Sequence, residues 1–251
     1  MRKPLVAGNW KMNLLVADAV KLVKELKPLV QGISGVDIVV CPTFTALYAV
    51  GAALKGSNIE LGGQNCYLKE SGAFTAEISP QMLKDVGCTW TIIGHSERRQ
   101  FFGENDALLN EKLKFALASG LKVMFCIGET LDERQGGKMK DVLTRQVTKG
   151  LAGLSEADFD KVSVAYEPVW AIGTGVTASP DQAQEAHAFV RGLLKTQFGA
   201  AVADKVRIQY GGSVKADNAA ELMAKPDVDG ALVGGAALKA DGFAAILKGA
   251  L

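Results

Sequence analysis

The chain has 251 residues, of which 48% are hydrophobic and 22% are charged, so it can form one large domain or two small ones of ordinary globular composition. Its formal net charge of +1 gives no electrostatic basis for binding nucleic acid or an anionic membrane surface. The longest apolar runs, such as residues 46–54, are far shorter than the roughly 20 residues that cross a bilayer, and the stretch after Arg2 and Lys3 is too short for a signal peptide.

Short apolar, β-branched runs alternate with amphipathic segments along the whole chain. Most runs are continuously hydrophobic, which is typical of strands covered on both faces. The predicted strands are Leu5–Asn9, Val36–Cys41, Ile59–Gln64, Thr89–Gly94, Leu121–Ile127, Lys161–Tyr166, Lys205–Gln209 and Asp229–Val233. The predicted helices are Ala17–Val30, Thr45–Leu54, Pro80–Val86, Asn105–Ser119, Met139–Leu151, Pro180–Phe198, Ala216–Ala224 and Gly242–Lys248.

The helix predicted from residue 180 to 198 has the clearest sequence signals. Ser179 supplies a capping hydroxyl before Pro180 at the first helical position, and Asp181 places negative charge in the first turn. The apolar residues at helical spacing are Ala183, Ala186, Phe189, Val190, Leu193 and Leu194. His187 falls on the polar face of this pattern, so we expect its ring to be solvated.

Eight strand–helix units in a chain of this length match the size and alternation of an α/β fold of the (β/α)8 barrel type, with eight parallel strands each followed by a helix. The alternative is a doubly wound open sheet. That fold normally has a glycine-rich dinucleotide-binding turn after its first strand, and residues 7–11 do not form one. No Pro- or Ser-rich linker divides the chain, so we expect a single domain over residues 1–251.

The cysteines have neither metal-like nor redox-like spacing; they are Cys41, Cys66, Cys88 and Cys126. Most lie in or beside apolar runs, so we expect buried free thiols in a reducing cytoplasm rather than disulfides. Cys126 ends a strand and could line a pocket, but packing is the favoured interpretation. Two histidines are too few for a conventional histidine-rich metal site, and we expect no bound metal or cofactor.

Polar residues and glycines follow the ends of several predicted strands. In a parallel barrel these ends open into one mouth, so residues from distant segments would converge there. The residues concerned are Asn9, Lys11, His95, Glu167, Gly211, Gly212, Ser213, Gly234 and Gly235. Only this architecture brings these residues together. Their joint occurrence at strand ends is therefore stronger evidence for a functional site than any single motif.

His95 precedes a short predicted helical turn. Ser96 is expected to cap this turn, whose positive end would lower the pKa of the imidazole and leave it neutral. A neutral imidazole can donate a proton to a carbonyl oxygen; the alternative is a histidine that only satisfies a strand–helix junction. Glu97, Arg98 and Arg99 are expected to form supporting ion pairs.

The remaining candidates also have two interpretations each. Lys11 could stabilise developing negative charge, whereas an isolated lysine at a strand end is usually solvated. Asn9 can donate a hydrogen bond to a ligand, although asparagine is also a common turn former. A glycine pair often marks only a tight turn. Two pairs, at residues 211–212 and 234–235, together with Ser213, predict backbone N–H groups that close on a phosphate.

Residues 166–175 carry a carboxylate at the end of an apolar run, followed by a stiff, apolar and then glycine-containing loop. The loop is expected to be a lid: Trp170 and Ile172 can cover a site, and Gly173 lets a backbone N–H approach a ligand. The alternative is an ordinary surface loop. With the other candidates, Glu167 predicts proton transfer next to the carbonyl of a small phosphorylated substrate.

Several segments resemble the signatures of triosephosphate isomerase; they are residues 7–13 (AGNWKMN), 94–99 (GHSERR), 165–175 (AYEPVWAIGTG) and 210–214 (YGGSV). The resemblance covers essentially the whole chain, in the same order. It implies a TIM barrel with one catalytic domain and a cytoplasmic enzyme of glycolysis and gluconeogenesis. The implied reaction interconverts dihydroxyacetone phosphate and D-glyceraldehyde 3-phosphate through an enediol(ate), without a cofactor.

The resemblance also implies roles for single residues. Glu167 is implied as the base that shuttles the proton, His95 as the neutral electrophile, and Lys11 as the charge-stabilising cation. The implied substrate-binding residues are Asn9, Lys11, Gly173, Ser213, Gly234 and Gly235. Glu97 is implied in a supporting role.

The loop around Thr75 resembles the interdigitating interface loop of this family, which is usually dimeric. A homodimer is therefore implied, with Thr75 reaching towards the neighbouring active site. Ala76 stands where the family often has glycine, so we expect strain if the position needs a left-handed backbone.

Two other functions would keep part of the pattern. A non-catalytic phosphometabolite-binding barrel would keep the glycine pairs but need not keep Glu167, His95 and Lys11 together. A Schiff-base aldolase would use Lys11 as its nucleophile, although such lysines need a desolvated pocket.

Overall fold

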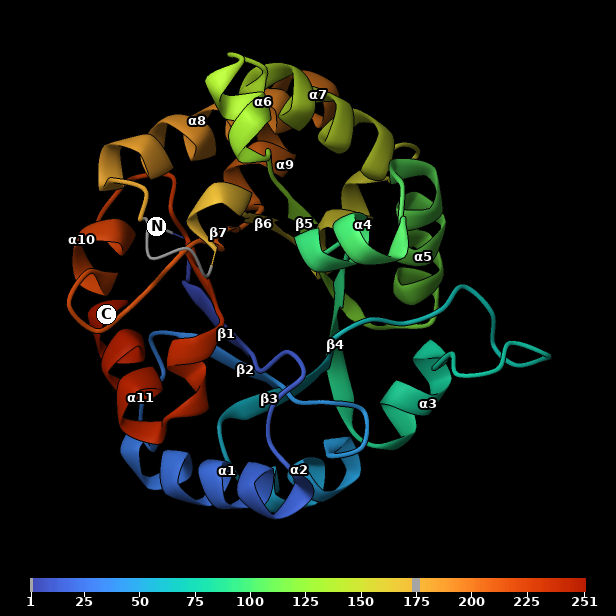
Figure 1. Cartoon of the computed structure of the whole chain (residues 1–251), viewed down its shortest axis with the longest axis vertical. Helices are drawn as coiled ribbons and strands as arrows, with labels where there is room; N and C mark the ends of the chain where they lie inside the picture. Colours follow the sequence, from blue (N-terminus) through green and yellow to red (C-terminus); the bar gives the residue numbers. More distant parts are fainter. Residues whose placement is uncertain (1, 173–176) are drawn as a thin grey trace.

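The computed structural model of the chain describes residues 2–172 and 177–251. Gly173, predicted to bind phosphate, lies outside these residues. Within them, eight strands close into one barrel in chain order, and each neighbouring pair is parallel (Figure 1). The strands are β1 (Leu5–Asn9), β2 (Asp37–Cys41), β3 (Ile59–Gly63), β4 (Cys88–Ile93), β5 (Lys122–Ile127), β6 (Val162–Tyr166), β7 (Ile208–Tyr210) and β8 (Gly230–Val233). The predicted (β/α)8 barrel is confirmed.

Helices surround the barrel on its outside (Figure 1). They are α1 (Val16–Val30), α2 (Leu47–Leu54), α3 (Pro80–Asp85), α4 (Ser96–Phe102), α5 (Asp106–Ala118), α6 (Leu131–Gln135), α7 (Met139–Gly150), α8 (Pro180–Phe198), α9 (Ala200–Lys205), α10 (Ala219–Met223) and α11 (Ala240–Gly249). The predicted cap of α8 is confirmed, because Ser179 Oγ accepts the N–H of Gln182 at 3.1 Å. The short helical turn predicted after His95 is helix α4, whereas the short helices α6 and α9 were not predicted.

The barrel wall is buried on both sides, which explains why its strands are continuously hydrophobic. Inward-facing side chains form a small apolar cluster; its members are Leu5, Ala7, Val39, Cys41, Trp90, Ile92, Met124, Cys126, Ala165 and Leu232. Outward-facing residues such as Val6, Val40 and Phe125 join a larger cluster under the helices. All four cysteines are buried free thiols, as predicted.

The seventh strand begins later than predicted. Lys205 ends α9 instead of starting a strand, because the alanines at residues 200, 201 and 203 favour a helix. The N–H of Val206 still bonds to the carbonyl of Val202 at 3.0 Å, and β7 starts only at Ile208.

No helix in the described parts of the chain is long and apolar enough to cross a membrane.

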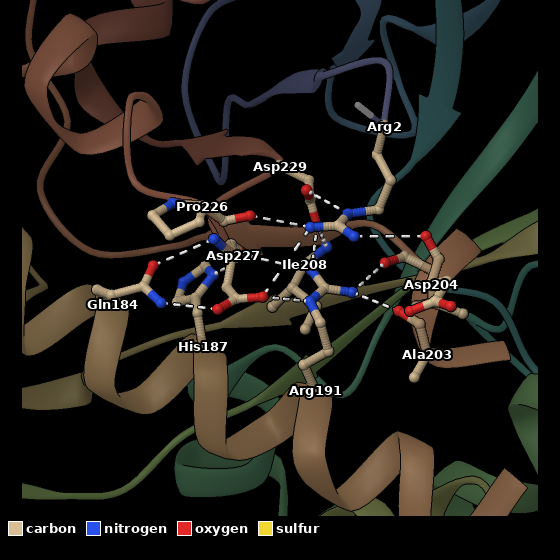
Figure 2. Close-up of polar contacts among 11 residues, drawn as sticks. Arg2, Gln184, His187, Arg191, Ala203, Asp204, Ile208, Pro226, Asp227 and Asp229 are labelled. Atoms are coloured by element: carbon tan, nitrogen blue, oxygen red, sulfur yellow. Dashed lines mark hydrogen bonds and ion pairs between the residues drawn. The ribbon is translucent and has the colours of Figure 1, made fainter. Parts of the chain in front are cut away.

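A cluster of ion pairs fastens α8 to the last two strands and to the start of the chain (Figure 2). Arg191 places Nε 2.5 Å from Asp227 Oδ1 and Nη2 2.5 Å from Asp229 Oδ2. Arg2 Nε contacts the other oxygen of Asp229 at 2.6 Å. Asp229 also accepts the N–H of Ile208 at 2.8 Å, so one carboxylate joins β7 and β8 to both arginines.

His187 lies inside this cluster and is fully buried, so the prediction of a solvated ring was wrong. Its Nδ1 lies 3.1 Å from the carbonyl of Asp227 (Figure 2), and its ring meets the ring of Tyr166 edge-on at 5.7 Å. The buried face of α8 includes His187 because a barrel tyrosine and a backbone carbonyl lie opposite it. Burial lowers the pKa of His187 to about 4.

We expect His187 to make the fold acid-sensitive. The unfolded histidine has a pKa of about 6.5, so between pH 6.5 and 4 the unfolded state binds the extra proton and stability falls by up to about 3 kcal/mol. The variant His187→Phe should lose less stability than the native protein when urea unfolding is compared at pH 7 and pH 4.5. Equal losses of unfolding free energy in the two proteins would show that His187 is not the source of the acid sensitivity.

Candidate active site

The carboxyl ends of the strands surround a cavity of about 680 Å³. The predicted residues that line it are Asn9, Lys11, His95, Glu167, Gly211, Gly212, Ser213, Gly234 and Gly235. They come from the ends of β1, β4, β6, β7 and β8, as expected for a mouth formed by parallel strands. Groups far apart in the sequence therefore face the same space.

Lys11 has a left-handed backbone with φ 52°, an uncommon conformation for a residue with a side chain. Neighbouring amides hold it: its N–H donates to Asn9 Oδ1 at 3.1 Å, and its carbonyl accepts from Gln64 Nε2 at 2.8 Å. Its ammonium lies 2.6 Å from Glu97 Oε1. Gln64 was not predicted as a site residue, since an amide at a strand end is a weak signal.

His95 caps α4 itself, so the prediction that Ser96 is the cap was wrong. The N–H of Glu97 donates to His95 Nδ1 at 3.2 Å, which leaves Nε2 to carry the proton of the neutral ring. Nε2 lies 2.8 Å from Glu167 Oε1. Ser96 is the first helical residue, and its N–H donates to Glu167 Oε2 at 2.9 Å. The first N–H groups of α4 therefore bind both the imidazole of His95 and the carboxylate of Glu167.

The carboxylate of Glu167 is 1% exposed and is held in its charged form. Burial raises the pKa of Glu167, but His95, the Ser96 N–H and the Lys11 cation outweigh burial and lower it overall. A buried carboxylate remains ionised only when such partners compensate for its lost hydration.

The pKa of His95 is raised, whereas the helical turn was predicted to lower it. Burial lowers this pKa, but the negative charge of Glu167 beside Nε2 raises it more, and Glu97 adds to the effect. The prediction considered the helix alone and missed the carboxylate brought close by β6. The hydrogen bond from the Glu97 N–H favours the neutral ring, because a protonated Nδ1 could not accept it.

The supporting ion pairs predicted after His95 are confirmed. Glu97 binds the Lys11 ammonium, as described above. Arg98 Nε lies 2.7 Å from Glu104 Oε1, and Arg99 Nη1 lies 2.6 Å from Asp106 Oδ1.

Glu129 is a buried residue of the site region that the sequence did not reveal. Its Oε1 accepts from Tyr166 Oη at 3.0 Å, from Trp170 Nε1 at 2.9 Å and from Arg134 Nη1 at 3.4 Å. Tyr166 precedes Glu167 and Trp170 follows it, so Glu129 holds both sides of the segment that carries the carboxylate. A sequence offers no signal for this role, because the donors lie on distant or flanking segments.

Glycine stands in the two pairs for different physical reasons. A Cβ on Gly211 would lie 2.8 Å from Glu167 Cγ, and one on Gly212 would lie 2.2 Å from Tyr210 Oη. Close packing therefore requires glycine there. A Cβ on Gly235 would meet no atom within 4 Å, so close packing does not require glycine at the start of the 3₁₀ turn Gly235–Leu238. The first N–H groups of such a turn have no partner within it.

Thr75 does not line the cavity; it is exposed. It belongs to the segment between β3 and α3, which projects away from the barrel (Figure 1). Ala76 in this segment has φ 77°, so alanine does occupy a left-handed backbone position.

The cavity brings together a carboxylate, an imidazole N–H, an ammonium and open backbone N–H groups. This set can remove a proton from carbon, stabilise the resulting oxyanion and hold an anionic group nearby. Among residues 2–172 and 177–251, no three His, Cys, Asp or Glu side chains are grouped as metal ligands.

We expect Glu167→Gln to lower the pKa of His95, because the change removes the negative charge beside Nε2 that opposes burial. Titration of the imidazole nitrogens by ¹⁵N NMR measures this directly. An unchanged or higher pKa in the variant would contradict the coupling. The exposed substitution Glu185→Gln serves as the control and should leave the His95 titration unchanged.

Comparison with known proteins agrees with this geometry. The family model described as triosephosphate isomerase matches residues 4–250. Triosephosphate isomerase of Carboxydothermus hydrogenoformans is 56% identical over 251 residues and covers all of both chains. The enzymes of Geotalea uraniireducens and Pelobacter propionicus are 55% and 54% identical over 248 residues, covering 99% of each chain. The chain belongs to the triosephosphate isomerase family.

Proposed function

We propose that this protein is an aldose–ketose isomerase that interconverts dihydroxyacetone phosphate and D-glyceraldehyde 3-phosphate, with residues 1–251 acting as one catalytic domain. The observation that carries the proposal is the meeting of Glu167, His95 and Lys11 at one cavity of a chain from this family. A barrel that only binds a phosphometabolite need not keep a buried carboxylate, an imidazole donor and a cation around the same space.

Proton transfer conserves the atoms of the substrate. Glu167 takes the proton from the carbon next to the carbonyl, and negative charge develops on the carbonyl oxygen. His95 Nε2 gives its proton to that oxygen and takes the proton of the neighbouring hydroxyl in exchange, while the Lys11 ammonium stabilises the negative charge. Glu167 then returns its proton to the former carbonyl carbon, whose oxygen is now a hydroxyl. The neighbouring carbon, whose hydroxyl has lost its proton, becomes the carbonyl of the other isomer. Oxidation of one carbon balances reduction of the next, so the reaction needs no external electron carrier.

The substrate carbonyl is expected to take the place of Glu167 beside His95. Glu167 Oε1 occupies the hydrogen-bonding position at Nε2, 2.8 Å away. When the carboxylate moves to the substrate carbon, the charge that raises the pKa of His95 leaves Nε2. The Glu97 N–H continues to favour the neutral ring, which therefore becomes the proton donor in the complex.

The phosphate is expected to bind in the same cavity against Ser213, Gly234 and Gly235, which line it. The first N–H groups of the 3₁₀ turn that begins at Gly235 suit phosphate oxygens. Gly173 is expected to add a backbone donor from the lid.

A homodimer formed through the loop around Thr75 is part of the proposal. Its support is a set of exposed apolar side chains that come from the first four strand–helix units; they are Met12, Leu15, Phe44, Tyr48, Phe74, Met82, Phe101 and Phe102. Neighbouring units of the barrel thus contribute apolar surface of the kind that marks protein interfaces. The buried free thiols support a cytoplasmic location.

A coupled assay with D-glyceraldehyde 3-phosphate tests the reaction. The native protein should form product, and Glu167→Asp should lower kcat by about 100-fold, since a shorter base misplaces its oxygen by about 1 Å. The control Glu185→Asp, on the exposed side of α8, should retain full activity. Absence of product with the native protein would favour a phosphometabolite-binding barrel.

The aldolase alternative has a separate test. Borohydride reduction in the presence of substrate would trap a covalent adduct on Lys11 if this lysine formed a Schiff base. We expect no adduct, because the Lys11 ammonium is paired with Glu97 at 2.6 Å.

Phe74→Asp should weaken the proposed dimer. Phe74 is partly exposed, packs against Tyr67 with ring centroids 4.8 Å apart and precedes Thr75 in the projecting loop. Light scattering should show a smaller mass, and activity should fall as the neighbour's loop is lost. Leu29→Asp, on the outer helix α1, is the control and should change neither. A fully active monomer would contradict the contribution of the neighbour.

A further inference from the structure

The hydrogen bonding between β5 and β6 continues past the ends of both strands. The N–H of Glu167 donates to the carbonyl of Ile127 at 2.7 Å, and the N–H of Val169 donates to the carbonyl of Glu129 at 3.1 Å. In a parallel ladder alternate residues bond to opposite neighbours, so Gly128 directs its N–H and carbonyl away from β6.

Gly128 has no strand neighbour on that other side. The pairing of β4 with β5 ends at Ile93 and Phe125, and within the described residues the chain turns into α4 soon afterwards. Gly128 is half-buried, so both of its backbone groups would lack a protein partner unless a side chain supplied one.

Gln146 of α7 supplies both partners. Its Oε1 accepts the N–H of Gly128 at 2.8 Å, and its Nε2 donates to the carbonyl of Gly128 at 3.1 Å. A primary amide has the same donor and acceptor as a peptide group, so this side chain takes the place of the missing strand. Gln146 is 3% exposed, which makes these bonds hard for solvent to replace.

Gly128 in turn touches the backbone of the catalytic base. A Cβ built on Gly128 would lie 1.7 Å from the carbonyl oxygen of Glu167, so only glycine permits this approach. Gly128, Gln146, Glu167 and Trp170 also line a second cavity of about 680 Å³. This free space leaves Gly128 room to shift if its hydrogen bonds are lost.

We propose that Gln146 is a positioning residue of the isomerase reaction. By binding both backbone groups of Gly128 it fixes the peptide against which Glu167 rests, and so sets the place from which the carboxylate reaches the substrate carbon. This role rests on the proposed function, because it requires Glu167 to be the base.

The test compares Gln146→Met with Asn110→Leu. Asn110 on α5 is a matched control: its Nδ2 donates to the carbonyls of Gly150 and Ala152, at 2.8 and 3.0 Å, beyond the active site. Each variant loses two hydrogen bonds to backbone, so both should unfold at a lower temperature. Only Gln146→Met should lose kcat, by about 10- to 100-fold, with KM little changed, as expected for a misplaced base.

The pH profile adds a measurement that lost stability alone would not change. If Glu167 is displaced from the Ser96 N–H, its pKa rises, and the acid limb of the kcat/KM profile moves to higher pH in Gln146→Met but not in Asn110→Leu. The variant Gln146→Glu still accepts the Gly128 N–H but loses the donor to its carbonyl. Its kcat should lie between those of the native protein and Gln146→Met.

Several outcomes would overturn the role. One is a kcat of Gln146→Met equal to that of Asn110→Leu at a temperature where both are folded. Another is a rise in KM alone, which would indicate substrate binding. If Gln146→Met fails to fold, the variant Gln146→Glu becomes the test. A native kcat in this variant, with the acid limb of its kcat/KM profile at the native pH, would overturn the proposal. An inactive native protein would instead refute the proposed function.

Discussion

A buried carboxylate must be given hydrogen-bond donors, and much of the site is arranged to supply them to Glu167. The first peptide of α4 and the imidazole before it bind the two carboxylate oxygens, and the peptide of Ile127 accepts the N–H of the same residue. These donors and acceptors come from β5, from the start of α4 and from the residue that caps α4. Without closure of the barrel they would lie apart, so the chemistry depends on parallel strand pairing.

The fold could be predicted from the sequence because its signals are local. A strand such as Val162–Tyr166 is buried on both faces and is therefore hydrophobic throughout, and the cap at Ser179 is a neighbouring hydroxyl. The positions of Asn9, Lys11, His95 and Glu167 in one cavity follow from strand ends alone once the barrel is assumed. Lys205 was assigned to a strand because the alanine-rich helix before it was not recognised.

What the sequence could not reveal depends on contacts between distant segments. His187 looked solvated because helical periodicity cannot show that Tyr166 and the carbonyl of Asp227 lie opposite it. The direction of the His95 pKa shift depends on Glu167, which is 72 positions away along the chain and 2.8 Å away in space. Gln146 reads as an ordinary helical residue, and only the early end of β4 gives its amide a role.

The contact between Arg2 and Asp229 has a consequence for synthesis of the chain. The two residues are 227 positions apart, so the first strand leaves the ribosome long before its partner β8 exists. Until β8 has been made, the β1 edge of the nascent sheet lacks its partner, and an unpaired strand edge is a template for pairing with other chains. The two arginines can secure Asp229, and with it the closure of the barrel, only after that strand has been synthesised.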